Sequence, residues 1–350
     1  MLTCLMEHVE VIPGRALDAS HVRSWEEIRC ANPELQSPYF TAEFMRIVAS
    51  VRDDVEVAVV WENGEIIAFF PFQRSKFDPS RGIPLANLIS DFQGLICKPD
   101  FACNPLRLIA RCGLVVYNFN HFLASQKSFS RYHHYREPSP QIDLSRGYDA
   151  YVKGKRNEGS GLIKSCANLA RRIEREVGPL RFVAHSADPD LLQHVLALKG
   201  EQLIRTGYRN IFAVDWVQVV IEKIHATQRD DFAGMLSLLY AGDRLIAGHF
   251  GMRSRTVWHY WFPAYDKHMA KYSPGLNLIL KMAAYAPSAG LRKIDLDRGT
   301  TLYKRRLMNG EIAVARGSID RRYVSQVRTA LARSPLGPPV RWLKRHLAKS

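Results

Sequence analysis

The stretch KYSPGLNLIL, residues 271–280, comes shortly after a strongly aromatic segment, TVWHYWFPAYD, residues 256–266. The aromatic segment predicts a β-strand, and the apolar run after Pro274 predicts a helix that begins at a Ser-Pro-Gly turn. The segment RKIDLDRG, residues 292–299, predicts another strand. A strand, a helix and a strand joined by a short crossover indicate a βαβ unit with parallel pairing. The fold class is therefore α+β or α/β.

The Ser-Pro-Gly turn has two interpretations. A helix N-terminus exposes backbone N–H groups that bind anions such as pyrophosphate. Gly275 allows a ligand to approach the backbone closely, and Lys271 adds positive charge. The alternative is a plain corner in the chain, which these ten residues alone favour. The position of the turn inside a βαβ unit instead favours the anion site.

Two distant segments align without gaps, VVWENGEIIAFF at residues 59–70 and LLYAGDRLIAGH at residues 238–249. Each predicts a β-hairpin with a glycine-containing turn, and two predicted helices precede each hairpin. The repeated order predicts two related domains, each a mixed sheet flanked by helices. We place them at residues 1–150 and 151–325, with a basic C-terminal tail at residues 326–350.

The composition limits the classes of function. The chain has 350 residues, with 49 Lys and Arg against 34 Asp and Glu, and the net charge of +15 favours acidic partners. No apolar run is long enough for a transmembrane helix, and the first residues do not resemble a signal peptide. Six scattered cysteines without metal-type spacing fit a reducing compartment, so we expect a cytoplasmic protein without a metal.

The segment IDLDRGTTLYKRRL, residues 294–307, carries the candidate chemistry. Asp295 and Asp297 alternate on the predicted strand and so should face opposite sides. A carboxylate at this strand end is placed to accept a proton from an attacking amine, and the hydroxyl of Tyr303 to return one to a leaving thiolate. The alternative is a strand that simply ends in acids before a solvated basic helix. His249 and His259, in the neighbouring predicted strands, flank the same cleft, and we expect both to bind substrate. The alternatives are a hydrogen-bonded histidine of the core or cleft and a catalytic histidine.

These motifs together resemble a known family. AYDKHMAKYSPGLNLIL followed by GLRKIDLDRGTTLYKRRL resembles the CelD/BcsL-like acetyltransferases, whose relatives include the FemAB-type transferases of peptidoglycan synthesis. KRNEGSGLIKSCANLARRIEREVGPLRF is similar to the basic helix that opens the second domain of that family. The resemblance covers roughly residues 20–320 and implies tandem GNAT-like domains, the second of them, at 151–325, carrying the acyltransferase site.

The resemblance also implies roles for individual residues. An acyl-CoA, acetyl-CoA above all, would be the acyl donor. The coenzyme site would be lined by Tyr272, Ser273, Pro274 and Gly275. The strand-end pattern of the family is matched by Asp295, Arg298, Gly299, Tyr303 and Lys304, and Arg298 and Lys304 would contact substrate. The family has Gly where this chain has Asp297 and acids where it has Thr300 and Thr301, so the general base stays open between the two aspartates.

Three classes of function follow. The first is an acyl-CoA-dependent transferase that acylates an amine or hydroxyl of a small-molecule or glycan acceptor in polysaccharide or envelope synthesis. The second is a FemAB-like transferase that takes an aminoacyl group from tRNA, for which basic helices would follow the phosphate backbone. The third is a scaffold without catalysis. The basic tail at residues 326–350 has two interpretations in any of these classes. It carries Val340, Leu343 and Leu347 between basic residues, so it is either an amphipathic helix that binds an anionic lipid surface at the inner face of the membrane or a frayed end.

Overall fold

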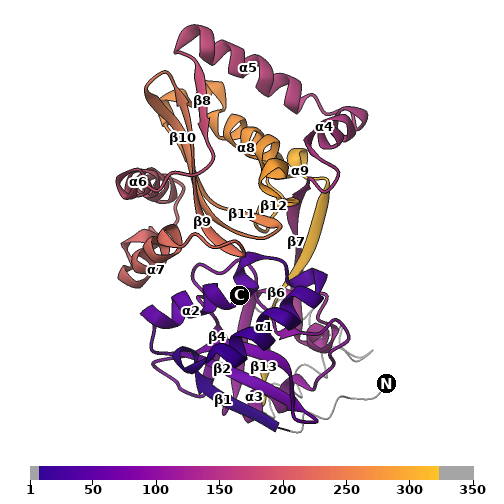
Figure 1. Cartoon of the computed structure of the whole chain (residues 1–350). Helices are drawn as coiled ribbons and strands as arrows, with labels where there is room; N and C mark the ends of the chain where they lie inside the picture. The colour runs from indigo at the N-terminus through magenta and orange to yellow at the C-terminus, as the bar shows by residue number, and fades with distance from the viewer. Residues whose placement is uncertain (1–7, 323–350) are drawn as a thin grey trace, which may run out of the picture.

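The computed structural model describes residues 8–322, so Cys4 and the predicted tail at 326–350 lie outside the described residues. One mixed sheet of thirteen strands runs through the whole described chain (Figure 1). Its order is β1 (His8–Pro13), β2 (Val55–Glu62), β3 (Glu65–Arg74), β4 (Arg81–Pro84), β6 (Val116–Leu123), β13 (Gly310–Asp320), β7 (His133–Asp143), β12 (Lys293–Asp295), β11 (Val257–Tyr265), β10 (Arg244–Ser254), β9 (Phe232–Ala241) and β8 (Leu180–Val183), and β5 (Ile96–Cys97) pairs with β3.

Nine α-helices cover the two faces of this sheet in the described residues. They are α1 (Ala19–Ala31), α2 (Ala42–Val51), α3 (Pro105–Arg111), α4 (Tyr148–Asn157), α5 (Leu162–Glu176), α6 (Pro189–Arg205), α7 (Asp215–Ala226), α8 (Pro274–Tyr285) and α9 (Leu302–Leu307). The predicted α+β class is confirmed.

The order of elements repeats along the chain, as the two aligned hairpins predict. A pair of helices, a hairpin, a third strand, a helix and a parallel strand occur first as α1, α2, β2–β3, β4, α3 and β6. They recur as α6, α7, β9–β10, β11, α8 and β12. The first hairpin turns at Asn63 and Gly64, which both have positive φ as a two-residue turn of this kind requires. The tandem arrangement is therefore present in the structure.

Two strands cross between the repeats. β7 precedes residue 150 in the sequence but pairs with β12 of the second repeat. β13 follows the second repeat but pairs with β6 of the first, and β7 and β13 pair with each other. These two strands connect the upper and lower parts of the molecule in Figure 1. The domain limits at residues 150 and 325 stay predictions, and the sheet itself continues across residue 150.

The hydrophobic core lies in layers on both sides of the sheet. One cluster joins α1, α2, α6 and α7 to one face across both repeats, with Trp25 and Phe250 among its largest buried side chains. α2 packs directly against α7 there. On the opposite face, α3 covers the first repeat while α5 and α8 cover the second. Burial of this continuous apolar layer ties the repeats into one body.

Helix α5 lies in the segment that resembles the basic helix of the family, and it is amphipathic. Leu162, Cys166 and Ile173 are buried, and the helix ends just before Gly178. Its exposed face carries basic side chains, among them Arg172, which pairs with Glu176 at 2.8 Å. No helix of the described part is long and apolar enough to cross a bilayer.

Candidate active site

The strands β11 and β12 separate partway along their length. They pair only where Val257–His259 lie beside Lys293–Asp295, whereas β11 continues to Tyr265. A bulge in β10 lies next to this point, since the register with β11 shifts between Phe250 and Met252. Gly251 makes the bulge possible, because a Cβ there would lie 2.2 Å from the carbonyl oxygen of His259. The edge of β11 beyond His259 is therefore not paired with β12.

A cavity of about 300 Å³ lies beside this open edge, at the start of α8. Its lining includes Tyr260 and Pro263 of β11, Ser273, Pro274 and Gly275 of the predicted turn, Tyr303 of α9, and Lys199 and Gln202 of α6. The first turn of a helix has amides without partners inside the helix, and these point toward the N-terminal end. The structure thus joins the predicted turn and Tyr303 in one cavity.

The turn itself is held by its own hydrogen bonds. Ser273 adopts a left-handed conformation, with φ 49° and ψ 53°, and its carbonyl oxygen accepts from the amides of Leu276 and Asn277. The Asn277 side chain donates to the carbonyl oxygens of Tyr272 and Ser273. A Cβ at Gly275 would meet only Tyr265, at 3.8 Å. The backbone at Gly275 is therefore open to a ligand, and the residues present fit the phosphate turn of a coenzyme.

A second, more polar cavity of about 540 Å³ adjoins the same turn. It shares Ser273 and Leu276 with the first cavity and is also lined by Lys155, Arg305 and Arg306. Lys155 is bound to Glu158 and to the carbonyl oxygen of Met308, so the two arginines are the cations best placed to meet an anionic ligand. A ligand that extends from one cavity to the other would pass the N-terminus of α8.

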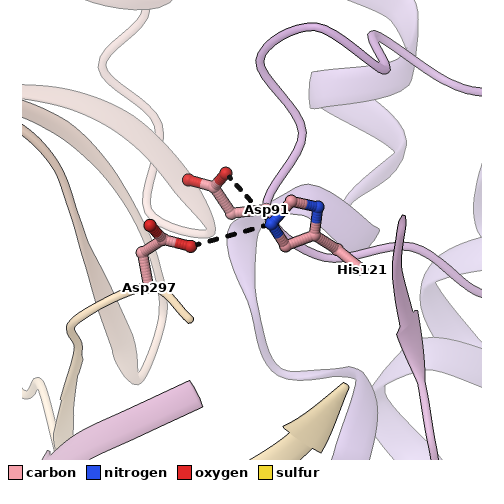
Figure 2. Close-up of side chains that lie close together, drawn as sticks. All are labelled: Asp91, His121 and Asp297. Carbon is pink, nitrogen blue, oxygen red and sulfur yellow. Dashed lines mark ion pairs between the residues drawn. The ribbon is translucent and has the colours of Figure 1, made fainter. Parts of the chain in front are cut away.

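A cluster of acidic and histidine side chains from both repeats lies where β11 and β12 begin to separate (Figure 2). Asp91 lies in the loop between β4 and β5, His121 in β6, and Asp297 just after β12. His121 Nε2 lies 3.9 Å from Asp91 Oδ1 and 3.9 Å from Asp297 Oδ1. Residues far apart in sequence thus surround one point at the junction of the repeats.

His259 connects this cluster to the interior. Its Nε2 lies 2.9 Å from Asp91 Oδ2 and its Nδ1 lies 3.4 Å from Asp295 Oδ1. Burial alone would lower the pKa of His259, but Asp295 and Asp91 raise it to about 9. The same contacts lower the pKa of Asp91 although burial acts to raise it, and the Tyr39 hydroxyl also donates to Asp91. His259 is therefore a buried imidazolium between two carboxylates.

The two predicted carboxylates occupy different environments, and their expected alternation on one strand is wrong. β12 ends at Asp295, and Asp297 follows outside the strand with a φ of 62°. Asp295 is fully buried and accepts hydrogen bonds from Ser139, Gln141 and the amide of Asp297. These bonds turn the chain back at the end of the strand, so that both acids face the cluster instead of opposite sides.

Asp297 is the more exposed of the two predicted carboxylates. Its side chain is 33% exposed, whereas that of Asp295 is 1% exposed. Burial and the negative charge of Asp91 raise the pKa of Asp297 to about 7, although Lys304 and His259 act to lower it. A carboxylate with a pKa near 7 is suited to accept a proton at neutral pH.

Four other predicted site residues, Arg298, Lys304, His249 and Tyr272, have side chains that are bound to other parts of the protein. Lys304 donates to the carbonyl oxygens of Asp297 and Arg298 and so supports the loop. Arg298 pairs with Glu137 at 2.9 Å. His249 is fully buried and accepts from the amide of Trp261, and Tyr272 is buried with its hydroxyl donating to Glu176. None of these four side chains is among the lining residues of the cavity beside β11.

Sequence reasoning missed three residues of the site, Asp91, His121 and Lys199. Burial and the charge of Lys304 lower the pKa of Lys199 to about 8, in the cavity at the start of α8. Asp91 and His121 lie in the first repeat, more than 150 positions before Asp297. No local pattern marks them, because only the pairing of the repeats brings them to the splayed strands.

The first repeat has a corresponding gap, and its own chain fills it. β4 and β6 pair only at Arg81–Gly82 with Val116–Tyr117. Beyond that point Gln93 pairs with the edge of β6. Its backbone amide donates to the His121 carbonyl oxygen, and its carbonyl oxygen accepts from the backbone amide of Leu123. The remaining cavity, lined by Phe92 and Gln93, is about 20 Å³. The same loop delivers Asp91 to the site in the second repeat.

The repeated topology, the splayed strands and the helix N-terminus beside them define a tandem GNAT fold. Residues 162–305 match the model of an acetyltransferase (GNAT) domain. No curated protein matches the sequence.

Solved structures agree on the fold. A FemX structure is 9% identical over 92% of this chain and 99% of that chain, with a TM-score of 0.57. The C-terminal domain of a lysylphosphatidylglycerol synthetase from Agrobacterium fabrum, itself a tentative assignment, is 13% identical over 90% of this chain and 96% of that chain, with a TM-score of 0.55. A tandem GNAT protein from the clavulanic acid biosynthesis pathway is 10% identical over 90% and 99%, with a TM-score of 0.53.

Proposed function

We propose that this protein is an acyl-CoA-dependent acyltransferase that uses acetyl-CoA and transfers the acyl group directly to an amine or hydroxyl. The observation that carries the proposal is the cavity between the open edge of β11 and the N-terminus of α8. Asp297 lies just after β12, where the two strands begin to separate. The match of residues 162–305 to an acetyltransferase (GNAT) domain supports it.

In this proposal the first turn of α8 binds the pyrophosphate of the donor. Backbone amides and the helix dipole favour an anion there. Gly275 leaves room for close approach, and Arg305 and Arg306 in the adjoining cavity meet the remaining phosphate. The pantetheine arm then lies along β11, where the thioester carbonyl reaches unpaired backbone N–H groups that stabilise the oxyanion.

Asp297 serves as the general base and Tyr303 as the acid. The acceptor loses a proton to Asp297 and attacks the thioester carbon, and the C–S bond then breaks. Burial raises the pKa of Tyr303 to about 12, so its phenol stays protonated and can donate to the leaving thiolate. Asp295, His259 and Lys304 position the base without contacting substrate.

The finer family placement is part of the proposal. The turn at 272–275 and the Asp-x-x-Arg-Gly-x-x-x-Tyr-Lys order from Asp295 to Lys304 support a CelD/BcsL-like transferase, with a glycan or other envelope precursor as acceptor. The exposed basic face of α5 supports the second candidate, a transferase that uses charged tRNA.

Calorimetric titration of the full chain with acetyl-CoA tests the proposal, paired with a titration of charged tRNA at low and high salt. We expect acetyl-CoA to bind at micromolar concentration and tRNA to bind only weakly. Absence of acetyl-CoA binding would refute the donor assignment, and tight, salt-sensitive binding of charged tRNA in its place would favour the second candidate.

A further inference from the structure

The cavity beside the open edge of β11 is lined from both faces of the sheet. Helices α6 and α8 pack against β11 from opposite faces (Figure 1). Gly275 and Ile279 line the cavity from the α8 side, and Lys199 and Gln202 line it from the α6 side. Direct transfer requires both substrates at one point. A donor that is bound at the start of α8 therefore leaves the α6 side of the cavity to the acceptor.

The α6 side has a second cavity of its own. This outer cavity, of about 370 Å³, shares Gln202 and Tyr265 with the cavity beside β11 and is also lined by Arg205 and Lys267. The polar cavity next to Arg305 instead adjoins the start of α8, on the side assigned to the donor. Each substrate thus has a separate adjoining cavity, and the two meet at the open edge of β11.

Lys199 is a cation without a neighbouring carboxylate on the acceptor side. Its Nζ lies 3.5 Å from Gln202 Oε1, and within residues 8–322 it forms no ion pair. Asp297 attracts it from a distance, but Asp297 Oδ2 lies 3.7 Å from Lys304 Nζ. Burial and the charge of Lys304 lower the pKa of Lys199 to about 8, so its amine is still mostly protonated at pH 7. A partly buried ammonium without an anion is costly, and an anionic ligand would relieve that cost.

Gln202 adds a second donor beside this ammonium. Because its Oε1 accepts from Lys199, its Nε2 is the group left to donate to a ligand. Arg205 follows at the same spacing of three residues on α6, with its side chain exposed in the outer cavity. An ammonium, an amide and a guanidinium along one face of the helix match the several acceptor oxygens of a carboxylate or a phosphate.

The acids of the outer cavity do not cancel these cations. Asp266 and Glu201 both line it. Asp266 is paired with Arg244 at 2.5 Å, which leaves Glu201 against two cations, Arg205 and Lys267. The outer cavity therefore has an excess of positive charge, and an acidic molecule would be attracted to it before its oxyanion reaches Lys199.

We propose that Lys199 and Gln202 bind an oxyanion of the acceptor, a carboxylate or a phosphate, so that the enzyme selects acidic acceptors. This inference rests on the acyltransferase function proposed above and names the chemical class of its acceptor. A neutral acceptor would bury the ammonium of Lys199 without a partner, whereas an acidic one would pair with it, and this difference gives the selection.

Binding of small probes to the full chain tests the inference, followed by saturation-transfer NMR with saturating coenzyme A so that the donor phosphate positions are filled. The probes are glycolate, methyl phosphate and the neutral glycolamide. We expect at least one anion to bind and glycolamide not to bind, and the anion that binds more tightly tells a carboxylate from a phosphate acceptor.

Substitutions assign the binding to Lys199. In Lys199→Gln the Kd of the anion should rise by about tenfold or more, while Lys199→Arg, which keeps the charge, should stay within about threefold of wild type. The Kd of coenzyme A should be unchanged in both variants. The matched control is Lys223→Gln, an exposed lysine of α7 away from both cavities, which should behave as wild type.

Three results would refute the oxyanion site while coenzyme A still binds. They are no binding of either anion, binding of glycolamide as tight as that of glycolate, and an unchanged anion Kd in Lys199→Gln. A loss of coenzyme A affinity in Lys199→Gln would also refute it, because Lys199 would then contact the phosphates of the donor. Absence of coenzyme A binding to the wild type would instead overturn the proposed function, on which this inference rests.

Discussion

Asp297 and Asp295 are separated by one residue, yet we expect them to behave differently on substitution. Asp297→Asn should reduce kcat by about 10²- to 10⁴-fold while acetyl-CoA binding is unchanged, because it removes the general base without altering the cavity. In the wild type, kcat/KM should fall as the pH drops below about 7, where Asp297 becomes protonated. A pH–rate profile of both proteins measures this, and a flat profile through pH 6–8 would contradict the assignment.

Asp295→Asn should act on stability instead. Asp295 is fully buried against the His259 imidazolium, and removal of one partner of a buried ion pair costs about 3–5 kcal/mol. We expect urea unfolding to show this loss. A stable Asp295→Asn protein that lacks only activity would make Asp295 the base instead.

His259 should make stability depend on pH. Its folded pKa of about 9 lies above the ordinary value of 6.5, so its contribution is fully present below pH 6.5 and is lost as the pH rises through 9. The free energy of unfolding should therefore fall between pH 7 and 10, by an amount on the order of a few kcal/mol. His259→Asn should be less stable at pH 7 and lose this pH dependence. Equal slopes in the two proteins would exclude the buried imidazolium.

At the scale of elements, the start of α8 is the part on which donor binding depends. Gly275→Val should abolish acetyl-CoA binding and leave the melting temperature near that of the wild type, because the added side chain projects toward the cavity and a Cβ meets only Tyr265 at 3.8 Å. Ser273→Ala should bind normally, since the backbone of Ser273 and not its hydroxyl makes the observed contacts. Titration calorimetry compares the three proteins, and normal binding by Gly275→Val would reduce the turn to a structural corner.

Much of the element level could be predicted from the sequence. The hairpins at β2–β3 and β9–β10, the helix pairs before them, and the crossover through α8 follow from local turn chemistry and apolar spacing. The early end of β12 at Asp295 could not be predicted from the sequence. Hydrogen bonds from Ser139 and Gln141 of β7 to Asp295 decide where the chain leaves the strand. Asp91 and His121 were missed for the same reason, since their role depends on contacts between distant segments.

At the scale of the whole molecule, the two repeats share one core but differ in the cavity beside their splayed strands. The loop that fills the gap between β4 and β6 leaves a cavity of about 20 Å³, against about 300 Å³ at the corresponding place in the second repeat. We therefore expect one acetyl-CoA per chain by native mass spectrometry. Two equivalents would show that the loop moves aside and that the first repeat is also a donor site.

The exchange of β7 and β13 should make unfolding cooperative. Residues 1–150 alone would leave β6 and β7 without β13 between them and would expose the apolar face where α2 meets α7. We expect this fragment to be unfolded or aggregated and the full chain to show one urea transition by both fluorescence and circular dichroism. A folded, monomeric fragment would support an independent domain ending near residue 150.

The most direct test of the account is a crystal structure of the protein with a non-hydrolysable acetyl-CoA analogue. We expect the pyrophosphate on the backbone amide at Gly275 and the acyl carbon in the gap between β11 and β12, on the side of Asp297. A coenzyme bound in the first repeat, or one whose acyl carbon lies away from Asp297, would contradict it.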